Sequence, residues 1–185
     1  MKKILSILST IPLIGTSTTS LVACDPPQKY TPEELKELKE KNKINTTNQE
    51  IKNNLEWISP QEKPFNEVDD KYYYVVWHSN SSENWRITKF KNDTKTSKEN
   101  GKRTIVNEHG VEKLFIFMET KGFIKNKEIK FPKDITVQWN SSFHWKFSQP
   151  NSETVFKSVY RWNCSDQNLP ALIVDNNGNV KVNGE

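Results

Sequence analysis

The chain has little of the material from which metal centres and nucleotide-binding loops are built. Its 185 residues include two cysteines, three histidines and six glycines. No histidine stands in a His-Glu-x-x-His pair, no Cys/His cluster has zinc-ligand spacing, and no glycine-rich phosphate loop occurs. Residues 175–179 lack the closing glutamate of an EF-hand loop and fit a hairpin turn better. We therefore expect no metal, no cofactor and no catalytic residue, and a protein that is not an enzyme; a His/Glu pair assembled by folding stays open as the alternative.

The chain also carries little net charge. The chain carries 27 basic and 23 acidic residues, and Lys2 and Lys3 lie in a segment expected to be removed. No acid precedes Cys24, so 25 basic and 23 acidic residues remain, a net charge of +2. This balance does not favour a nucleic-acid partner. Aromatic residues make up 11% of the chain, which argues against disorder along its whole length.

The chain contains no apolar run long enough to cross a bilayer comfortably. Lys2 and Lys3 form a short positive region, and residues 4–14 form an apolar stretch that Pro12 interrupts and Gly15 ends. A bilayer span needs about 20 apolar residues, whereas the apolar part of a signal peptide needs about 7–15. Residues 1–23 are therefore predicted to be a cleaved signal peptide, and a transmembrane anchor is the weaker interpretation.

This leader ends in Leu21, Val22, Ala23 and Cys24. The four residues resemble the lipobox of bacterial lipoproteins. The resemblance implies that the Cys24 thiol receives a diacylglyceryl group, with acyl chains such as palmitate, and that cleavage makes Cys24 the first residue. Two acyl chains suffice for stable anchoring. The implied location is the outer face of the cell membrane, and the alternative is an ordinary secretory signal cut near Ala23.

The opening MKKILSIL, the Ser/Thr-rich stretch and LVAC are similar to lipoproteins of mollicutes, particularly the spiroplasma kind, and the VYRWN segment at residues 159–163 is similar too. This resemblance implies a location and no activity. If Cys24 carries lipid, Cys164 has no partner for a disulfide. We expect Cys164 to be a small buried residue at the end of a strand.

Residues 24–70 are predicted to be a lipid-anchored spacer with helical segments. Thr31, Pro32 and Glu34 predict a helix start with a capping box. A second helix is expected over residues 49–57, where apolar residues recur at helical spacing. Neither segment carries many apolar side chains per turn, so we place the start of the folded domain at residue 71.

From residue 71 onward the apolar residues alternate, as in strands. Residues 71–185 are therefore predicted to form a mainly β domain, an antiparallel sandwich or barrel, with the helical segments as an N-terminal arm. A central strand is expected at 72–77, further strands at 85–88, 114–118 and 155–162, and hairpins at 123–131, 135–147 and 172–182.

Tyrosine and tryptophan exceed what a small core usually needs, and such rings suit sugars and protein partners. We take Tyr72, Tyr74, Trp77 and Trp162 as possible ligand contacts, and a structural role in the core as the alternative if residues 49–58 cover them. The expected function is adhesion or surface coating by a lipoprotein that binds a host protein or glycan. A ligand-capture lipoprotein serving a transporter is the first alternative, and an exported enzyme is the second.

Overall fold

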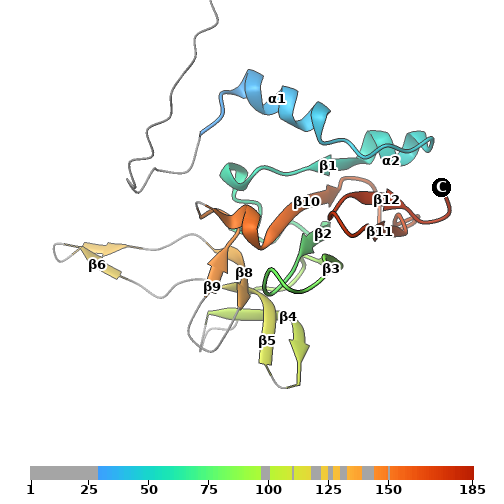
Figure 1. The fold of residues 1–185 in the computed structure, drawn as a ribbon. Coiled ribbons are helices and arrows are strands. Elements are labelled where there is room, and N and C mark those ends of the chain that lie inside the picture. Colours follow the sequence, from blue (N-terminus) through green and yellow to red (C-terminus); the bar gives the residue numbers. More distant parts are fainter. Residues whose placement is uncertain are drawn as a thin grey trace, which may run out of the picture.

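The computed structural model describes residues 29–96, 101–109, 111–117, 122–124, 127–129, 133–138, 144–149 and 151–185 (Figure 1). The fold is mainly β, with 38% of residues in strands and 17% in helices. The predicted mainly β, antiparallel class with N-terminal helices is confirmed, and of the two forms left open, sandwich or barrel, the described residues show no closed barrel.

Two four-stranded antiparallel sheets form the body of the protein. The first sheet has the order β1-β10-β2-β3 and consists of β1 (Leu55–Trp57), β10 (Phe156–Trp162), β2 (Tyr72–Trp77) and β3 (Arg86–Lys91). The second sheet has the order β4-β5-β8-β9 and consists of β4 (Lys102–Glu108), β5 (Val111–Phe117), β8 (Asp134–Gln138) and β9 (His144–Lys146).

Two small hairpins complete the strands. They are β6 (Gly122–Ile124) with β7 (Lys127–Ile129), and β11 (Leu172–Val174) with β12 (Val180–Val182). The hairpins predicted at 123–131, 135–147 and 172–182 are therefore confirmed as strand pairs.

The inner core lies between the two sheets. Strand β2 supplies Tyr73, Val75 and Trp77 to it, because alternate side chains of a strand share one face. Leu114 and Ile135 of the second sheet meet them from the opposite side. All five side chains are buried.

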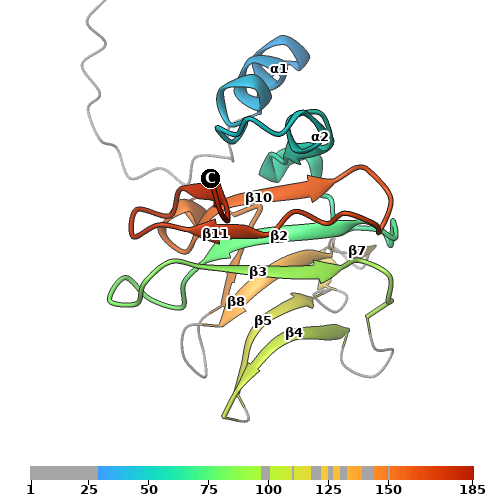
Figure 2. The same cartoon turned by 90° about the vertical axis from the view of Figure 1, so that its right-hand side faces the viewer.

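The other face of the first sheet is covered by a third layer. Tyr74 and Val76 of β2 and Tyr160 of β10 point to this outer side, where they pack with Ile51 and Val180. Ile51 lies on α2 (Gln49–Asn54), and Val180 lies on β12. Figure 2 shows both helices and the β11–β12 hairpin on the far side of the first sheet from β4 and β5. Strand β2 is thus buried on both faces, as its sequence predicted.

The arm begins with α1 (Pro32–Lys41), whose capping box between Thr31 and Glu34 is present as predicted. Helix α1 contains no buried residue. Helix α2 starts where predicted but ends at Asn54, because Leu55 leaves the helix to pair with Trp162 in β1. Two short 3-10 helices lie at η1 (Pro60–Glu62) and η2 (Ser152–Thr154).

Residues that precede the predicted domain start at residue 71 also contribute to the core. Ile58 and Phe65 are fully buried in the inner core, and Ile44 and Leu55 belong to the outer core. Leu55 pairs with Trp162 of β10, more than a hundred positions later. The folded unit therefore includes the chain from about Ile44, and only α1 resembles the solvated spacer that was expected.

Candidate functional site: a groove lined by lysines

A groove of about 610 Å³ lies between the α1–α2 linker (residues 42–48) and the C-terminal hairpin. The linker, β10 and β12 come from three distant parts of the chain. The lining residues are Lys41, Asn42, Lys43, Ile44, Asn45, Thr46, Thr47, Lys157, Ser158, Tyr160, Gly178, Asn179, Val180, Lys181, Val182 and Glu185. We call this the lysine groove.

The inner wall of the lysine groove is buried and mixed in polarity. Tyr160 and Ser158 of β10 meet Ile44 and Val180 there, and all four are buried. The Tyr160 hydroxyl donates a hydrogen bond to the carbonyl of Asn42 (3.2 Å) and so ties the linker to the first sheet. Burial raises the pKa of Tyr160, which therefore stays a neutral donor at physiological pH.

A β-bulge places Lys157 at the groove. The pairing register of β10 with β2 shifts between Phe156 and Ser158, so Lys157 is the extra residue. Its aliphatic stem packs on the hairpin turn at Gly178, where a Cβ atom would lie 2.9 Å from Lys157 Cγ. Gly178 also has a φ of +81°, a left-handed conformation that glycine adopts without strain. The turn and the bulge therefore fit each other closely.

The charge of the groove is mainly positive. Lys43 pairs with Glu40 on α1 (2.8 Å), and Lys181 lies 3.6 Å from the carboxylate of Asp175. Lys41 and Lys157 have no ion-pair partner among the residues that the structure describes. Both side chains are exposed.

The single acidic side chain of the groove is already engaged. The carboxylate of Glu185 accepts hydrogen bonds from the backbone N–H of Thr47 (3.3 Å) and from its hydroxyl (3.1 Å). Hydrogen bonds from Thr46 and then Thr47 lower the pKa of Glu185, so it is ionised at neutral pH. Glu185 thus ties the end of the hairpin to the linker, and its charge is directed at the linker rather than at the four lysines.

The aromatic residues proposed as ligand contacts are not in this groove. Trp77, Trp162 and Tyr74 are buried, with exposed fractions of 0%, 1% and 2%. Tyr72 is half-buried, and the Lys91 ammonium lies 5.6 Å from the centre of its ring. The burial of these three rings fits the core role that the sequence left open as the alternative. Helix α2 and the β11–β12 hairpin cover Tyr74 and Trp162 on the outer face of the first sheet, and the second sheet covers Trp77 on the inner face.

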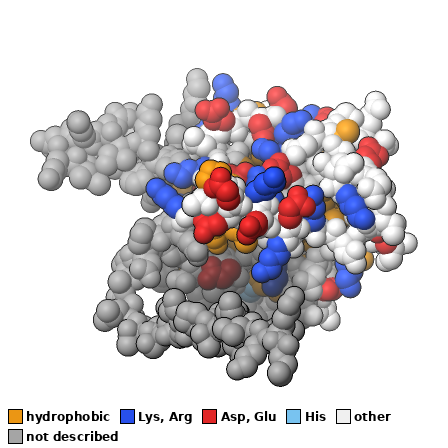
Figure 3. Space-filling model, turned by 90° about the horizontal axis from the view of Figure 1, so that it is seen from above, with side chains coloured by type: hydrophobic (Ala, Val, Ile, Leu, Met, Phe, Trp, Pro, Cys, Tyr) orange, Lys and Arg blue, Asp and Glu red, His pale blue; other side chains and the backbone are white. Residues whose placement is uncertain are grey.

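The polar edges of the three buried rings are also satisfied internally. The hydrogen bonds run from the Tyr74 hydroxyl to the Pro170 carbonyl (3.0 Å), from Trp77 Nε1 to Thr88 Oγ1 (2.9 Å) and from Trp162 Nε1 to the Ser165 carbonyl (3.0 Å). In the described part of the chain the large hydrophobic side chains with high exposure are Val111 (42%) and Ile173 (46%), neither of them aromatic. The view from above agrees, since acidic and basic side chains are interspersed there and hydrophobic ones form small patches (Figure 3).

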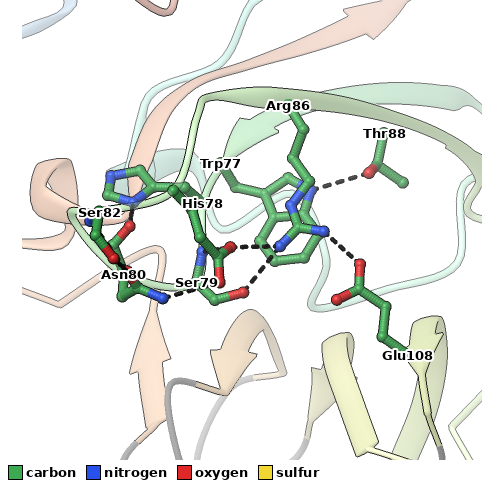
Figure 4. A network of polar contacts seen from close by, with 9 residues as sticks. Trp77, His78, Ser79, Asn80, Ser82, Arg86, Thr88 and Glu108 are labelled. Carbon is green, nitrogen blue, oxygen red and sulfur yellow. Dashed lines mark hydrogen bonds and ion pairs between the residues drawn. The ribbon is translucent and has the colours of Figure 1, made fainter.

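A second polar cluster lies at the end of β2, where Arg86 is its centre (Figure 4). The guanidinium lies over the ring of Trp77, 4.2 Å from the ring centre, and contacts Ser79 Oγ (3.0 Å) and the carboxylate of Glu83 (2.7 Å). It also pairs with Glu108 at the end of β4. Because Arg86 is on the first sheet and Glu108 on the second, this cluster joins the two sheets, and its donors and acceptors are occupied by one another.

The histidines lie apart from one another. His78 is buried, contacts the carbonyl of Asn80 through Nδ1 and meets the ring of Trp85 edge-on at 4.1 Å. His109 is exposed in the turn between β4 and β5, and His144 is exposed on β9. Within the described ranges no three His, Cys, Asp or Glu side chains gather as a metal site.

Cys164 is a free cysteine, and it is half-buried beside the outer core rather than fully buried as predicted. The predicted lipobox, Leu21, Val22, Ala23 and Cys24, lies outside the described residues. In the part of the chain that is described, no helix is long and apolar enough to cross a membrane.

Sequence reasoning missed the lysine groove entirely. Lys41, Lys43, Lys157 and Lys181 come from three segments, and no short motif contains more than two of them. The one available signal was the Asn177-Gly178 turn, which was predicted correctly, but nothing local indicated that residues 41–47 lie beside it. No protein-family model, curated protein or solved structure matches the chain.

Proposed function

We propose that the protein is a lipid-anchored, non-catalytic binding protein on the outer face of the cell membrane, and that the lysine groove is its binding site for an anionic ligand. The lipobox-like residues 21–24 support the anchor. The observation that carries the binding site is the excess of lysine in the groove, where the one carboxylate is already hydrogen-bonded to the linker.

The groove has the size and the chemistry for recognition. Its volume of about 610 Å³ falls within the range of roughly 300–1,000 Å³ that is typical of ligand sites. Four lysines attract an anion and raise its rate of encounter, and Asn45, Thr46 and Asn179 add hydrogen-bonding groups.

Capture of a small molecule for a transporter is the second candidate, and the volume of the groove favours it. However, all four lysines and Asn45 on the rim are exposed. Sites for small molecules bury most of the ligand surface. The exposed rim therefore favours contact with part of a larger ligand, such as a protein or glycan outside the cell.

The anchor is tested by Cys24→Ala. We expect this variant to accumulate as an unprocessed precursor and to lose labelling by radioactive fatty acid, whereas Cys164→Ala should be processed and labelled normally. A mature protein that begins at another residue, or that partitions into the aqueous phase of a detergent split, would show that the anchor is wrong.

The binding site is tested on cells that display the chain. Cells with the native protein should adsorb carboxylate-coated beads more strongly than cells with Lys41→Glu plus Lys181→Glu. The matched control is Lys36→Glu plus Lys89→Glu, which makes the same charge change at exposed lysines away from the groove. Equal adsorption by the native protein and the groove variant contradicts the proposal.

A further inference from the structure

Strand β12 is paired on one side only. It forms a two-stranded sheet with β11 in the described residues, and its register matches residue 181 with 173. The N–H of Asp175 donates to the Asn179 carbonyl (3.0 Å) and the N–H of Asn183 to the Ala171 carbonyl (2.8 Å). In an antiparallel pair the hydrogen-bonded residues alternate with residues whose backbone groups point away. Lys181 is therefore bonded to β11, and the N–H and C=O groups of Val180 and Val182 point to the opposite edge.

This free edge faces the lysine groove. Residues 178–182 all line the groove, although successive side chains of a strand point to opposite faces. Consecutive residues of a strand all line the same groove when the edge of the strand, rather than one of its faces, borders that groove. Outside the pairing with β11, the backbone N–H and C=O of Val180 and the N–H of Val182 form no backbone hydrogen bond with another described residue, whereas the Val182 carbonyl accepts a long one from Glu185 (3.4 Å).

We propose that the lysine groove binds an extended acidic segment of a partner protein, which adds to the β11–β12 hairpin as a third strand along β12. This inference rests on the proposed function, because it names the ligand class of the same groove. The Val180 and Val182 amides are spaced by two residues of an extended chain, about 6.8 Å. A peptide strand presents its own backbone groups at this spacing, so the two edges can pair.

The charges of the groove select an acidic strand. Lys181 stands on β12 itself, Lys157 stands at the bulge of β10, and Lys41 and Lys43 stand on the linker side. An acidic strand between these walls meets lysines on both sides. A second copy of this chain pairing through β12 would instead bring two sets of lysines together, which opposes self-association. An anionic glycan would satisfy the charges, but it lacks the backbone N–H and C=O groups that repeat every two residues along an extended chain and match the free edge of a strand.

The inference is tested by peptide binding to the full chain in detergent. The probe is a fluorescein-labelled peptide of alternating Glu and Thr, and a Lys/Thr peptide is the charge control. Two further forms of the Glu/Thr peptide are N-methylated at every second residue. In one form the methyl groups lie on one edge of the extended peptide, and in the other form they lie on the opposite edge. We expect the Glu/Thr peptide to bind, and at least one methylated form to bind about tenfold more weakly or worse, because N-methylation removes the donors of that edge. Lys41→Glu plus Lys181→Glu should also weaken binding about tenfold, and Lys36→Glu plus Lys89→Glu should not.

Amide hydrogen exchange provides a readout that purely electrostatic binding, without strand pairing, would not change. On binding, the amides of Val180 and Val182 should gain protection, whereas the Lys181 amide, already bonded to β11, should change little. Val182→Pro removes an N–H donor of the free edge and none of the donors bonded to β11, so it should weaken binding. Because the proline ring also fixes φ, thermal unfolding of the variant shows whether the hairpin is retained. The exchange measurement on the native chain decides the question if that variant unfolds.

Each failure points to a different part of the reasoning. If both methylated forms bind as tightly as the unmethylated Glu/Thr peptide, or if exchange at Val180 and Val182 is unchanged, strand addition is overturned. Equal binding of the Lys/Thr peptide overturns the selection for acid. If no peptide binds while carboxylate-coated beads still distinguish the groove variant, the strand inference is lost and the proposed anionic binding site stands.

Discussion

Replacing Glu56 by Gln removes the charge that holds the helical arm to the first sheet. The Glu56 carboxylate on β1 accepts hydrogen bonds from Arg161 (2.8 Å) and Asn163 (2.9 Å) through Oε2, and it pairs with Lys39 of α1 through Oε1. Lys39 also contacts Glu62 (2.7 Å). Since α1 buries no residue, this cluster is a principal attachment of the helix.

The electrostatics of the cluster set the size of the effect. Burial opposes ionisation of Glu56, but hydrogen bonds from Asn163, Lys39 and Arg161 outweigh it and lower the pKa from 4.5 to about 2. Burial alone would lower the pKa of Lys39, yet Glu56 and Glu62 raise it. A unit of pKa shift corresponds to about 1.4 kcal/mol, which gives an upper bound of about 3 kcal/mol for Glu56. The side chain keeps 24% of its surface exposed, so solvent screening reduces the expected contribution to about 1–2 kcal/mol.

The pH dependence follows from the sign of the shift. Because the pKa of Glu56 is lower in the folded state, its stabilisation is complete above the unfolded-state pKa near 4.5 and is lost as the pH falls towards 2. Urea unfolding should therefore show Glu56→Gln less stable than the native protein by about 1–2 kcal/mol at pH 7, with a difference that shrinks towards zero near pH 2. Glu50→Gln, at an exposed position on α2, is the control and should track the native protein. A difference between Glu56→Gln and the native protein that stays constant from pH 7 to pH 2 would refute the reasoning.

Three further outcomes follow from the fold. Trp162→Ala should lower the free energy of unfolding by about 3–5 kcal/mol, because the ring is buried between the first sheet and its outer layer. An unchanged melting temperature would show that the ring is not part of the core. Gly178→Ala should cost about 1–2 kcal/mol in urea unfolding, because the left-handed backbone and the 2.9 Å approach to Lys157 both resist a Cβ atom, and a neutral effect would contradict this account. Limited proteolysis should release α1 and leave a resistant fragment that begins near Ile44. A resistant fragment that begins at residues 60–71 would instead support a domain start near residue 71, as the sequence predicted.

Local patterns in the sequence predicted the elements whose signals are local. The run at residues 72–77 is apolar at successive positions, and β2 contributes side chains to both cores. The Asn177-Gly178 turn predicted the β11–β12 hairpin, and Thr31 with Glu34 predicted the capping box of α1. In each case a few neighbouring residues specify the geometry.

Elements defined by distant partners were missed or misplaced. Residues 55–57 continue the helical spacing of Ile51, Leu55 and Ile58, yet they form β1 because β10 offers an edge to pair with. Strand β4 was not predicted, since its side chains are polar or only half-buried. The same limit explains why Tyr74 was taken as a possible ligand contact. The sequence shows that Tyr74 lies in an apolar strand, but it does not show that residues from α2 and β12 cover its side chain.

The burial of the aromatics changes what kind of recognition the protein can perform. The described aromatic rings are buried or half-buried and join three layers, so none offers an open platform for a sugar ring or an apolar partner. The groove offers lysines, amide and hydroxyl side chains and a free strand edge instead. Interactions between exposed charges are screened over about 8–10 Å at ordinary ionic strength, whereas backbone hydrogen bonds and aromatic stacking are much less sensitive to salt. Binding at the groove should therefore weaken as salt is added without vanishing, because the strand pairing persists after the lysines are screened. A purely electrostatic site would lose all binding under the same conditions, and an aromatic platform would lose almost none.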